Sequence, residues 1–311
     1  MAGRTSVVTG GAGFIGSHLT DALLEAGDSV VVIDDLSSGR AELVASEAQL
    51  ETVSVTDANA VDAVVSATRP ARIFHLAAQA SVTASVTDPH RDCAVNVQGT
   101  LNVLEAARRH RSPVVFASTG GALYGNDAPL PTPESQIPAP LSPYGASKWA
   151  AEAYVVTWAH ANDAPHTVCR LGNVYGPRQS PHGEAGVVAI FSYQLWHGDT
   201  PTMFGFGRPT RDYIHVADVV RALLAASGVR GVFNVATGHE TSVQEVFDVL
   251  QSAAGTNADP ALASLRPGEL ERSRLDPGRA QQELGWKPEI DFGEGLRTTY
   301  RELAAEFSTR S

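Results

Sequence analysis

The feature that most constrains the fold is a run of glycines between a short apolar strand and an amphipathic helix. Residues 5–10 form a β-branched run that is typical of a buried strand, and residues 14–27 place apolar side chains at helical spacing. Between them, Gly10, Gly13 and Gly16 are each three residues apart. The first glycine permits a tight turn, the second lets backbone approach a ligand, and the third allows the helix to pack closely on the strand.

Strands and helices continue to alternate along the chain. Residues 29–35, 72–78 and 112–119 have the composition of buried strands, and residues 96–110 form an amphipathic helical pattern. Strands that alternate with helices predict a parallel sheet covered on both faces. The expected fold class is therefore α/β, a Rossmann-type doubly wound parallel sheet with a smaller C-terminal α/β domain.

The glycine turn and the end of the second strand together predict a bound dinucleotide. The helix that follows the turn directs free N–H groups and its positive end toward a diphosphate. Asp34 lies 18 residues after Gly16, close to the ~20 residues at which a ribose-binding acid is expected. Its carboxylate would accept hydrogen bonds from the ribose hydroxyls and repel a 2′-phosphate, so NAD is expected rather than NADP. Asp35 is either a further contact or a solvated neighbour.

A tyrosine and a lysine share one face of a predicted helix. In SPYGASKWAAE, residues 142–152, Tyr144 lies four residues before Lys148. An ammonium group favours the phenolate, and so would an oxidised nicotinamide, so we expect the pKa of Tyr144 to fall below its usual ~10. Such a group could take a proton from a sugar or alcohol hydroxyl. An ordinary surface pair is the alternative, which the neighbouring dinucleotide pattern disfavours.

Hydroxyl groups and a proline-rich segment are expected beside this pair. Ser118 and Thr119 end a predicted strand, where ligands bind in open α/β sheets, although each hydroxyl could instead cap a turn. Residues 126–143 contain six prolines, and we interpret them as a long loop over the mouth of a site rather than a linker.

Composition argues against several other classes of protein. A formal net charge of −11 over 311 residues disfavours nonspecific nucleic-acid binding. Cys93 and Cys169 form neither a disulfide framework nor a metal-type spacing, which favours a reducing compartment. No apolar run approaches the ~20 residues of a membrane span, so a cytoplasmic protein without membrane or nucleic-acid partners is expected. The spacings of His18, His75 and His215 suit no metal, and core or cap roles are expected for them.

Several motifs, taken in order along nearly the whole chain, resemble the extended short-chain dehydrogenase/reductase family. They are VVTGGAGFIGSHL, IDDLSSG, HLAAQASV, NVQGTLNVLEAA, STGGALYG, SPYGASK, CRLGNVYGPRQ and RDYIHVADV. Within that family the chain most resembles the NAD-dependent nucleotide-sugar 4-epimerases of the UDP-glucose 4-epimerase group, and GPRQSPHGEAGVVAIF strengthens this likeness.

The resemblance implies roles for individual residues. Tyr144 would be the catalytic base, and Lys148 its partner and a contact to the nicotinamide ribose. The family's third catalytic hydroxyl falls on Gly120 here, so Thr119 or Ser118 would take that role. The implied cofactor contacts are Gly10, Gly13, Phe14, Ile15, Gly16, Asp34, Asp35, Leu36, Ser37, Gly39, Ser54, Val55, Leu76, Ala77, Gln79, Asn96, Tyr144 and Lys148, with Ser54 and Val55 at the adenine. The implied substrate contacts are Ser118, Thr119, Asn173, Val187, Phe204, Arg211, Arg266 and Glu269, with both arginines on the diphosphate.

The implied activity is 4-epimerisation of a UDP-sugar of the UDP-glucose/UDP-galactose type, by transient oxidation at C4, rotation of the 4-keto sugar and re-reduction. A UDP-glucuronate 4-epimerase is an alternative, although Ser180 replaces the arginine which that group tends to have. A nucleotide-sugar 4,6-dehydratase is a second alternative, but Gly121 and Ala122 replace its acid pair. A non-catalytic NAD-sensing protein is a third, although such proteins commonly lose the tyrosine or the lysine, and both are present.

Domain organisation is also expected to follow the family. Residues 1–172 would form the NAD-binding domain, with a return of the chain at 213–238, and residues 173–311 the nucleotide-sugar domain. A homodimer is expected through helices such as 96–110 and 145–160. Near the C-terminus, LDPGRAQQELGW predicts a helix with Asp276 as N-cap, Pro277 at its first position and Gly285 after its last turn.

Overall fold

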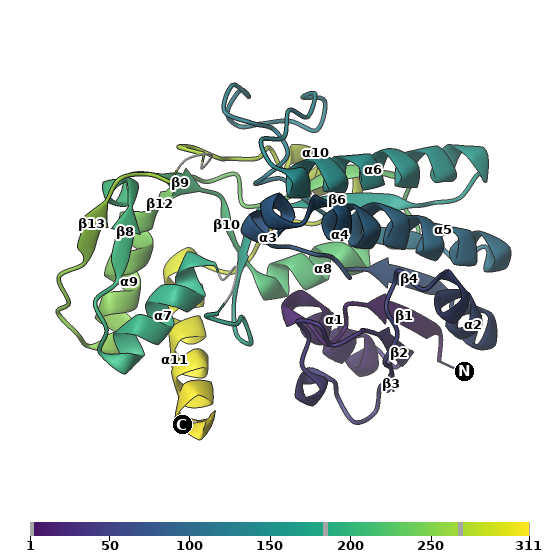
Figure 1. The fold of residues 1–311 in the computed structure, drawn as a ribbon, viewed down its shortest axis with the longest axis horizontal. Helices are drawn as coiled ribbons and strands as arrows, with labels where there is room; N and C mark the ends of the chain where they lie inside the picture. The colour runs from purple at the N-terminus through teal and green to yellow at the C-terminus, as the bar shows by residue number, and fades with distance from the viewer. Residues whose placement is uncertain (1–2, 183–185, 267–269, 311) are drawn as a thin grey trace.

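The computed structural model describes residues 3–182, 186–266 and 270–310, and a parallel sheet lies at its centre (Figure 1). In this part of the chain the sheet has seven strands in the order β11-β6-β5-β4-β1-β2-β3, all of them parallel to their neighbours. The strands are β1 (Thr5–Thr9), β2 (Ser29–Ile33), β3 (Gln49–Glu51), β4 (Arg72–His75), β5 (Val114–Thr119), β6 (Thr167–Leu171) and β11 (Gly231–Val235). The order reverses between β1 and β4, which is the doubly wound arrangement, so the predicted fold class is confirmed.

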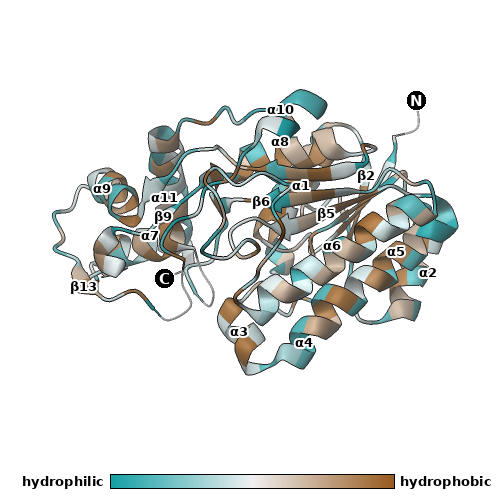
Figure 2. Ribbon diagram, turned by 90° about the horizontal axis from the view of Figure 1, so that it is seen from above, coloured by the Kyte–Doolittle hydropathy of each residue, from teal (hydrophilic) through white to brown (hydrophobic). Residues whose placement is uncertain are grey.

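Helices cover both faces of this sheet (Figure 2). One face packs against α1 (Phe14–Glu25), α8 (Val216–Ala226) and α10 (Gly278–Glu283). The other packs against α2 (Ala58–Thr68), α5 (Gly99–His110) and α6 (Pro143–Ala161). Because successive strand residues point to opposite faces, Val8 and Val32 lie in the first core, whereas Val7 and Val31 lie in the second.

A smaller lobe lies beside the carboxyl end of the sheet (Figure 1). Its core joins α7 (Val187–His197), α9 (Val243–Ala254) and α11 (Phe292–Arg310) through side chains such as Phe191, Phe247 and Leu296. Short strand pairs complete the fold: β7 (Asn173–Tyr175) with β10 (Tyr213–His215), β8 (Thr202–Phe204) with β13 (Ala261–Ala263), and β9 (Thr210–Arg211) with β12 (Thr241–Ser242).

Most of the predicted elements are present, with shifted ends. The expected strand at 233–238 is β11, which pairs with β6 and so returns the chain to the large sheet. The predicted helix at 96–110 starts inside a π-helical turn, Ala94–Gln98, and continues as α5. Two short helices precede it, α3 (Val82–Thr87) and α4 (Pro89–Cys93). Residues 126–142 contain no regular helix or strand, as expected of a long loop.

The predicted start of the last short helix is wrong by one residue. Pro277, not Asp276, is the N-cap, and α10 begins at Gly278. Asp276 instead closes a turn, because its carboxylate accepts a hydrogen bond from the Gly278 N–H at 2.9 Å. Its carbonyl oxygen accepts another from the Asn234 side chain, which ties this turn to β11.

Candidate active site

The glycine turn between β1 and α1 has no room for a side chain at Gly10 or at Gly16. Gly10 has φ +72°, and a Cβ built on it would lie 2.6 Å from the backbone nitrogen of Ala77. A Cβ on Gly16 would overlap the carbonyl oxygen of Gly10. Gly13 is the N-cap of α1 and has no side chain to cap the first-turn N–H groups, including those of Phe14 and Ile15. The turn therefore fits a diphosphate approaching the helix N-terminus.

Asp34, the predicted ribose-binding residue, is hydrogen-bonded to the glycine turn. Its buried carboxylate accepts hydrogen bonds from the N–H groups of Ala12 at 3.0 Å and Leu36 at 2.9 Å. A Cβ on Gly39 would lie 2.7 Å from one of its oxygens, so the loop passes close to it. Burial raises the pKa of Asp34, although both backbone hydrogen bonds act in the opposite direction. The carboxylate thus orders the turn from the position that the sequence predicted for a ribose contact.

The other residues of the β2 loop and the adenine position differ in what they can contact. Asp35 is exposed, and its carboxylate accepts a hydrogen bond from the Ser37 N–H at 3.0 Å, which suits a solvated neighbour. Val55 is buried in the core, where its side chain packs against Gly99. Ser54 is partly exposed, so of these two side chains it is the more accessible for an adenine contact.

The segment after β4 is hydrogen-bonded to the π-helical turn Ala94–Gln98. The Gln79 N–H donates to the Asn96 side-chain oxygen at 2.9 Å, and the Asn96 side-chain nitrogen donates back to the Gln79 carbonyl at 3.0 Å. Leu76 and Ala77, which directly follow the strand, each pack against a core of the sheet. The four predicted cofactor residues Leu76, Ala77, Gln79 and Asn96 are therefore held together beside the glycine turn by packing and by two hydrogen bonds.

The predicted catalytic groups lie together at the carboxyl edge of the sheet. The Thr119 hydroxyl lies beside the Tyr144 phenol and, as a hydrogen-bonding neighbour, acts to lower its pKa. Lys148 is one turn along α6, and its ammonium nitrogen lies 4.2 Å from the centre of the Phe116 ring. Ser142 caps α6 by accepting a hydrogen bond from the Gly145 N–H at 3.2 Å, with Pro143 at the first position. This start of the helix fixes the tyrosine at the end of β5.

The expected fall in the pKa of Tyr144 is wrong for the protein without ligands. Burial raises that pKa to about 12, and the negative charge of Asp92 acts in the same direction against the Thr119 hydrogen bond. Burial also lowers the pKa of Lys148 to about 7. The sequence showed that a phenol and an ammonium share a helix face, but not that the sheet buries both.

Thr119, rather than Ser118, is the strand-end hydroxyl beside the tyrosine. Ser118 Oγ is buried and has no hydrogen-bond partner within the described ranges. Leu275 packs directly over Gly120, which occupies the family's usual hydroxyl position: a Cβ there would overlap the Leu275 side chain. A serine or threonine at this position would therefore require Leu275 to shift.

The predicted substrate residues are only partly brought together. The Arg266 guanidinium lies 3.9 Å from the centre of the Phe204 ring, which joins the predicted diphosphate and uracil contacts. Asn173 begins β7, and its side-chain oxygen would lie 3.1 Å from a Cβ on Gly121, beside the catalytic strand end. Val187 starts α7 and packs in the small-lobe core.

The other two predicted substrate residues are Arg211 and Glu269. Arg211 lies in β9 and donates a hydrogen bond to the Thr210 carbonyl at 2.8 Å. Glu269 lies outside the described residues.

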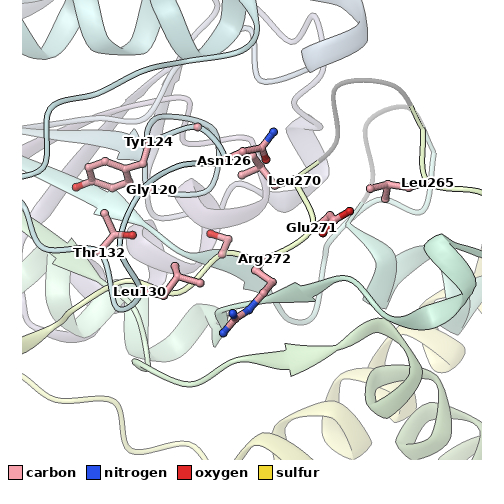
Figure 3. Close-up of a pocket in the computed structure, with 12 residues that line it drawn as sticks. Gly120, Tyr124, Asn126, Leu130, Thr132, Leu265, Leu270, Glu271 and Arg272 are labelled. Atoms are coloured by element: carbon pink, nitrogen blue, oxygen red, sulfur yellow. The ribbon is translucent and has the colours of Figure 1, made fainter.

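A cavity of about 620 Å³ opens beside the catalytic strand end, between the proline-rich loop and the segment before α10 (Figure 3). Figure 3 shows Tyr124 and Thr132 on one side and Glu271 and Arg272 on the other. Its lining residues are Gly120, Tyr124, Gly125, Asn126, Ala128, Leu130, Thr132, Leu265, Leu270, Glu271, Arg272 and Ser273. The loop thus lines a cavity next to Thr119, and of these residues none had been predicted from the sequence as a contact. The six prolines were the only local signal.

His75 and His215 have the core and cap roles expected of them. His75 is buried between the hydroxyls of Thr9 at 2.7 Å and Thr100 at 3.0 Å, and burial lowers its pKa to about 3. His215 accepts a hydrogen bond from the Ala217 N–H and caps α8. Across the described ranges no group of three metal-type side chains gathers, and no helix is long and apolar enough to cross a membrane.

The match to a family model decides the classification. The model described as GDP-mannose 4,6 dehydratase matches residues 7–299. This chain belongs to that family. The family is part of the extended short-chain dehydrogenases/reductases, so the resemblance stated from the sequence motifs is confirmed.

Similar proteins of this family include several UDP-glucose 4-epimerases. One from Mycolicibacterium smegmatis is 46% identical over 302 residues, which cover 94% of this chain and 96% of the relative. The crystal structure of a Thermotoga maritima UDP-glucose 4-epimerase with UDP-glucose has a TM-score of 0.95 at 43% identity, covering 97% of this chain and 99% of that one. A Thermus thermophilus UDP-glucose 4-epimerase in complex with NAD has a TM-score of 0.90 at 42% identity, covering 96% and 98%.

Proposed function

We propose that this protein is an NAD-dependent 4-epimerase of a UDP-sugar of the UDP-glucose/UDP-galactose type. The observation that carries the proposal is the Tyr144–Thr119 hydroxyl pair, with Lys148 one helical turn away, at the sheet edge that also presents the glycine turn. The similar UDP-glucose 4-epimerases, which match over nearly their whole length, support it.

Tyr144, Thr119 and Lys148 have different roles at the sugar. Tyr144 takes the proton of the 4-hydroxyl and returns it after the 4-keto sugar has turned over, and Thr119 holds the phenol through its hydrogen bond. Lys148 contacts the nicotinamide ribose. NAD, when bound, supplies the reversible oxidation at C4 and, in its oxidised form, a positive charge that favours the phenolate.

Binding is divided between the two lobes. The glycine turn and Asp34 hold the cofactor within residues 1–172, which the chain rejoins at 213–238. Residues 173–311 form the nucleotide-sugar domain, where Arg211 and Arg266 bind the diphosphate and Phe204 packs near the uracil. Firm binding of the UDP part leaves the hexose free to turn between its two faces.

The protein is proposed to act in the cytoplasm as a homodimer. Two free cysteines, Cys93 and Cys169, suit a reducing compartment. Trp149 and Tyr154 expose large apolar surface on α6, one of the helices expected at the dimer interface.

The direct test is to incubate the purified protein with UDP-glucose, UDP-galactose, UDP-N-acetylglucosamine and UDP-glucuronate and to separate the products by chromatography. Tyr144→Phe should lose nearly all turnover and keep NAD binding, whereas Tyr154→Phe, on the exposed side of the same helix, should keep both. Full activity of Tyr144→Phe would contradict the assigned base. Bound NAD without turnover of any sugar would instead favour an NAD-sensing protein.

A further inference from the structure

A buried carboxylate lies behind the catalytic helix. Asp92, in α4, is 1% exposed. One of its oxygens accepts hydrogen bonds from the side-chain nitrogens of Gln79 at 2.9 Å and Asn96 at 3.1 Å. The same Asn96 nitrogen also lies 3.0 Å from Ser147 Oγ. A single amide nitrogen therefore links the Asp92 carboxylate to α6.

Ser147, which accepts the hydrogen bond from Asn96, lies in the turn of α6 between Tyr144 and Lys148. Ser147 directly precedes Lys148, and its hydroxyl donates to the carbonyl oxygen of Tyr144 at 3.0 Å. Asp92 is thus connected to the Tyr144–Lys148 turn through two buried side chains, those of Asn96 and Ser147. Its charge acts on both members, because burial keeps water from screening it.

The other carboxylate that acts on Lys148 is already paired. Glu152 lies one turn further along α6 and contacts Arg170 of β6 at 2.7 Å. The hydrogen bonds that Asp92 accepts from described residues come from neutral amides instead. Two carboxylates therefore face the lysine, and Asp92 is the one without a guanidinium in its hydrogen-bond set.

Beside Asp92, α4 also carries the exposed His90 and Arg91. The other elements that pack around α6 contribute little further charge. On β4, His75 remains neutral, since burial lowers its pKa to about 3. On β5, Phe116 presents its ring face to the ammonium. On α5, Glu105 is held by the indole nitrogen of Trp158 at 3.2 Å and by Arg108. The nearby α3 has no ionisable side chain.

We infer that Asp92 is a positioning residue whose fixed negative charge sets the pH range in which the Tyr144–Lys148 pair works. The inference rests on the proposed roles of Tyr144 as base and Lys148 as its cationic partner. The hydrogen bonds of Asp92 to Gln79 and Asn96 hold that charge in place.

The sign of the effect follows from electrostatics. Burial dominates both pKa values, and after it Glu152 and then Asp92 raise that of Lys148, while Asp92 raises that of Tyr144. Removing the charge of Asp92 should lower both pKa values together. The two limbs of the pH–rate profile report ionisation of the tyrosine and loss of the lysine proton. Both limbs should therefore move toward lower pH.

Asp92→Asn separates charge from hydrogen bonding, because the amide oxygen can still accept from Gln79 and Asn96. Asp92→Ser is a second variant that removes the charge with a smaller side chain. Asp248→Asn, on the exposed surface of α9, controls for the loss of one negative charge from the whole protein. Each is assayed for epimerisation of UDP-galactose across pH and for NAD binding by calorimetry.

A second readout follows the tyrosine without turnover. The ultraviolet absorbance of tyrosinate is titrated in the NAD-loaded protein, and the curve of the matching Tyr144→Phe protein is subtracted to remove the other tyrosines. In both Asp92 variants the titration and both limbs of the rate profile should move down by roughly half a unit to one unit, as expected for one buried charge. Asp248→Asn should not move them.

The two hypotheses fail in different ways. If the Asp92 variants turn over more slowly but keep the parent's pH profile and tyrosinate titration, the inference is wrong and the epimerase proposal stands. If the parent protein binds NAD but converts no UDP-sugar, the epimerase proposal fails, and the tyrosinate titration still decides whether Asp92 controls Tyr144.

Discussion

Replacing Glu152 by glutamine should destabilise the protein strongly, because it removes one half of a buried ion pair. Glu152 is 2% exposed and Arg170 is 6% exposed. Arg170 Nε lies 3.1 and 3.0 Å from the two carboxylate oxygens, and Nη2 lies 2.7 Å from one of them. The other partners of Arg170 are the Tyr124 hydroxyl at 2.7 Å and the Glu134 carbonyl at 3.2 Å, which carry no negative charge.

The size of the effect follows from this geometry. Removing one partner of a buried pair costs about 3–5 kcal/mol, since it leaves the other charge uncompensated. Glutamine can still accept a hydrogen bond, and Arg170 keeps two neutral acceptors, so the lower end of that range, about 3 kcal/mol, is expected. An unfolding entropy of about 2.1 cal/mol/K per residue then gives a fall in melting temperature of about 5 °C for a chain of this length.

Calorimetric melting of the ligand-free protein measures this change, with urea unfolding as a second measure. Glu283→Gln is the matched control, because Glu283 also pairs with an arginine at 2.7 Å, on the exposed surface of α10. That variant should melt close to the parent, since exposed pairs contribute little. Equal melting temperatures for the two variants would show that burial does not govern the strength of the Glu152–Arg170 pair, and would refute the reasoning.

Three further predictions concern backbone space and burial at the site. Gly10→Ala should abolish NAD binding measured by calorimetry, because φ is +72° and the new Cβ would lie 2.6 Å from the Ala77 nitrogen; undiminished affinity would count against the turn as the cofactor site. Lys148→Met should stabilise the ligand-free protein and flatten its pH dependence. Burial lowers the pKa of Lys148 in the folded protein to about 7, against a usual 10.5. Between these two pH values the unfolded chain binds one proton more than the folded protein, so the parent's free energy of unfolding should rise with pH. An equal rise in the variant, measured by urea titration, would contradict this. Gly120→Ala should cost about 1–3 kcal/mol by overlap with Leu275, and a double-mutant cycle with Leu275→Ala should give less than additive losses, whereas additivity would exclude that contact as the cause.

Much of the fold could be predicted because its signals are local. The glycine spacing, the β-branched runs and the position of Asp34 each depend on a few neighbouring residues, and they were enough to predict the doubly wound sheet. The spacing of Tyr144 and Lys148 likewise predicted a shared helix face. The one-residue error at Asp276 arose where a contact from Asn234, 42 residues away, holds the turn.

The electrostatics of the site could not be predicted in the same way. The ionisation of Tyr144 depends on how deeply the sheet buries it and on the charge of Asp92, which lies 52 residues earlier in the chain. Asp92 had no local signal, because the helical pattern predicted from the sequence began only at residue 96. The choice between Ser118 and Thr119 was also open, since neighbouring hydroxyls at a strand end differ only in where the rest of the protein places them.

The sequence by itself determined the parallel α/β sheet, the dinucleotide turn and the chemical types of the catalytic groups, because turn geometry and helical or strand periodicity are encoded in adjacent residues. The tertiary structure alone decided which hydroxyl lies beside Tyr144, how closely Leu275 packs on Gly120, and which carboxylates act on Lys148. Those properties arise from burial and from contacts between distant segments, and the free-energy cost of burying a charge exists only once the packed layers exclude water.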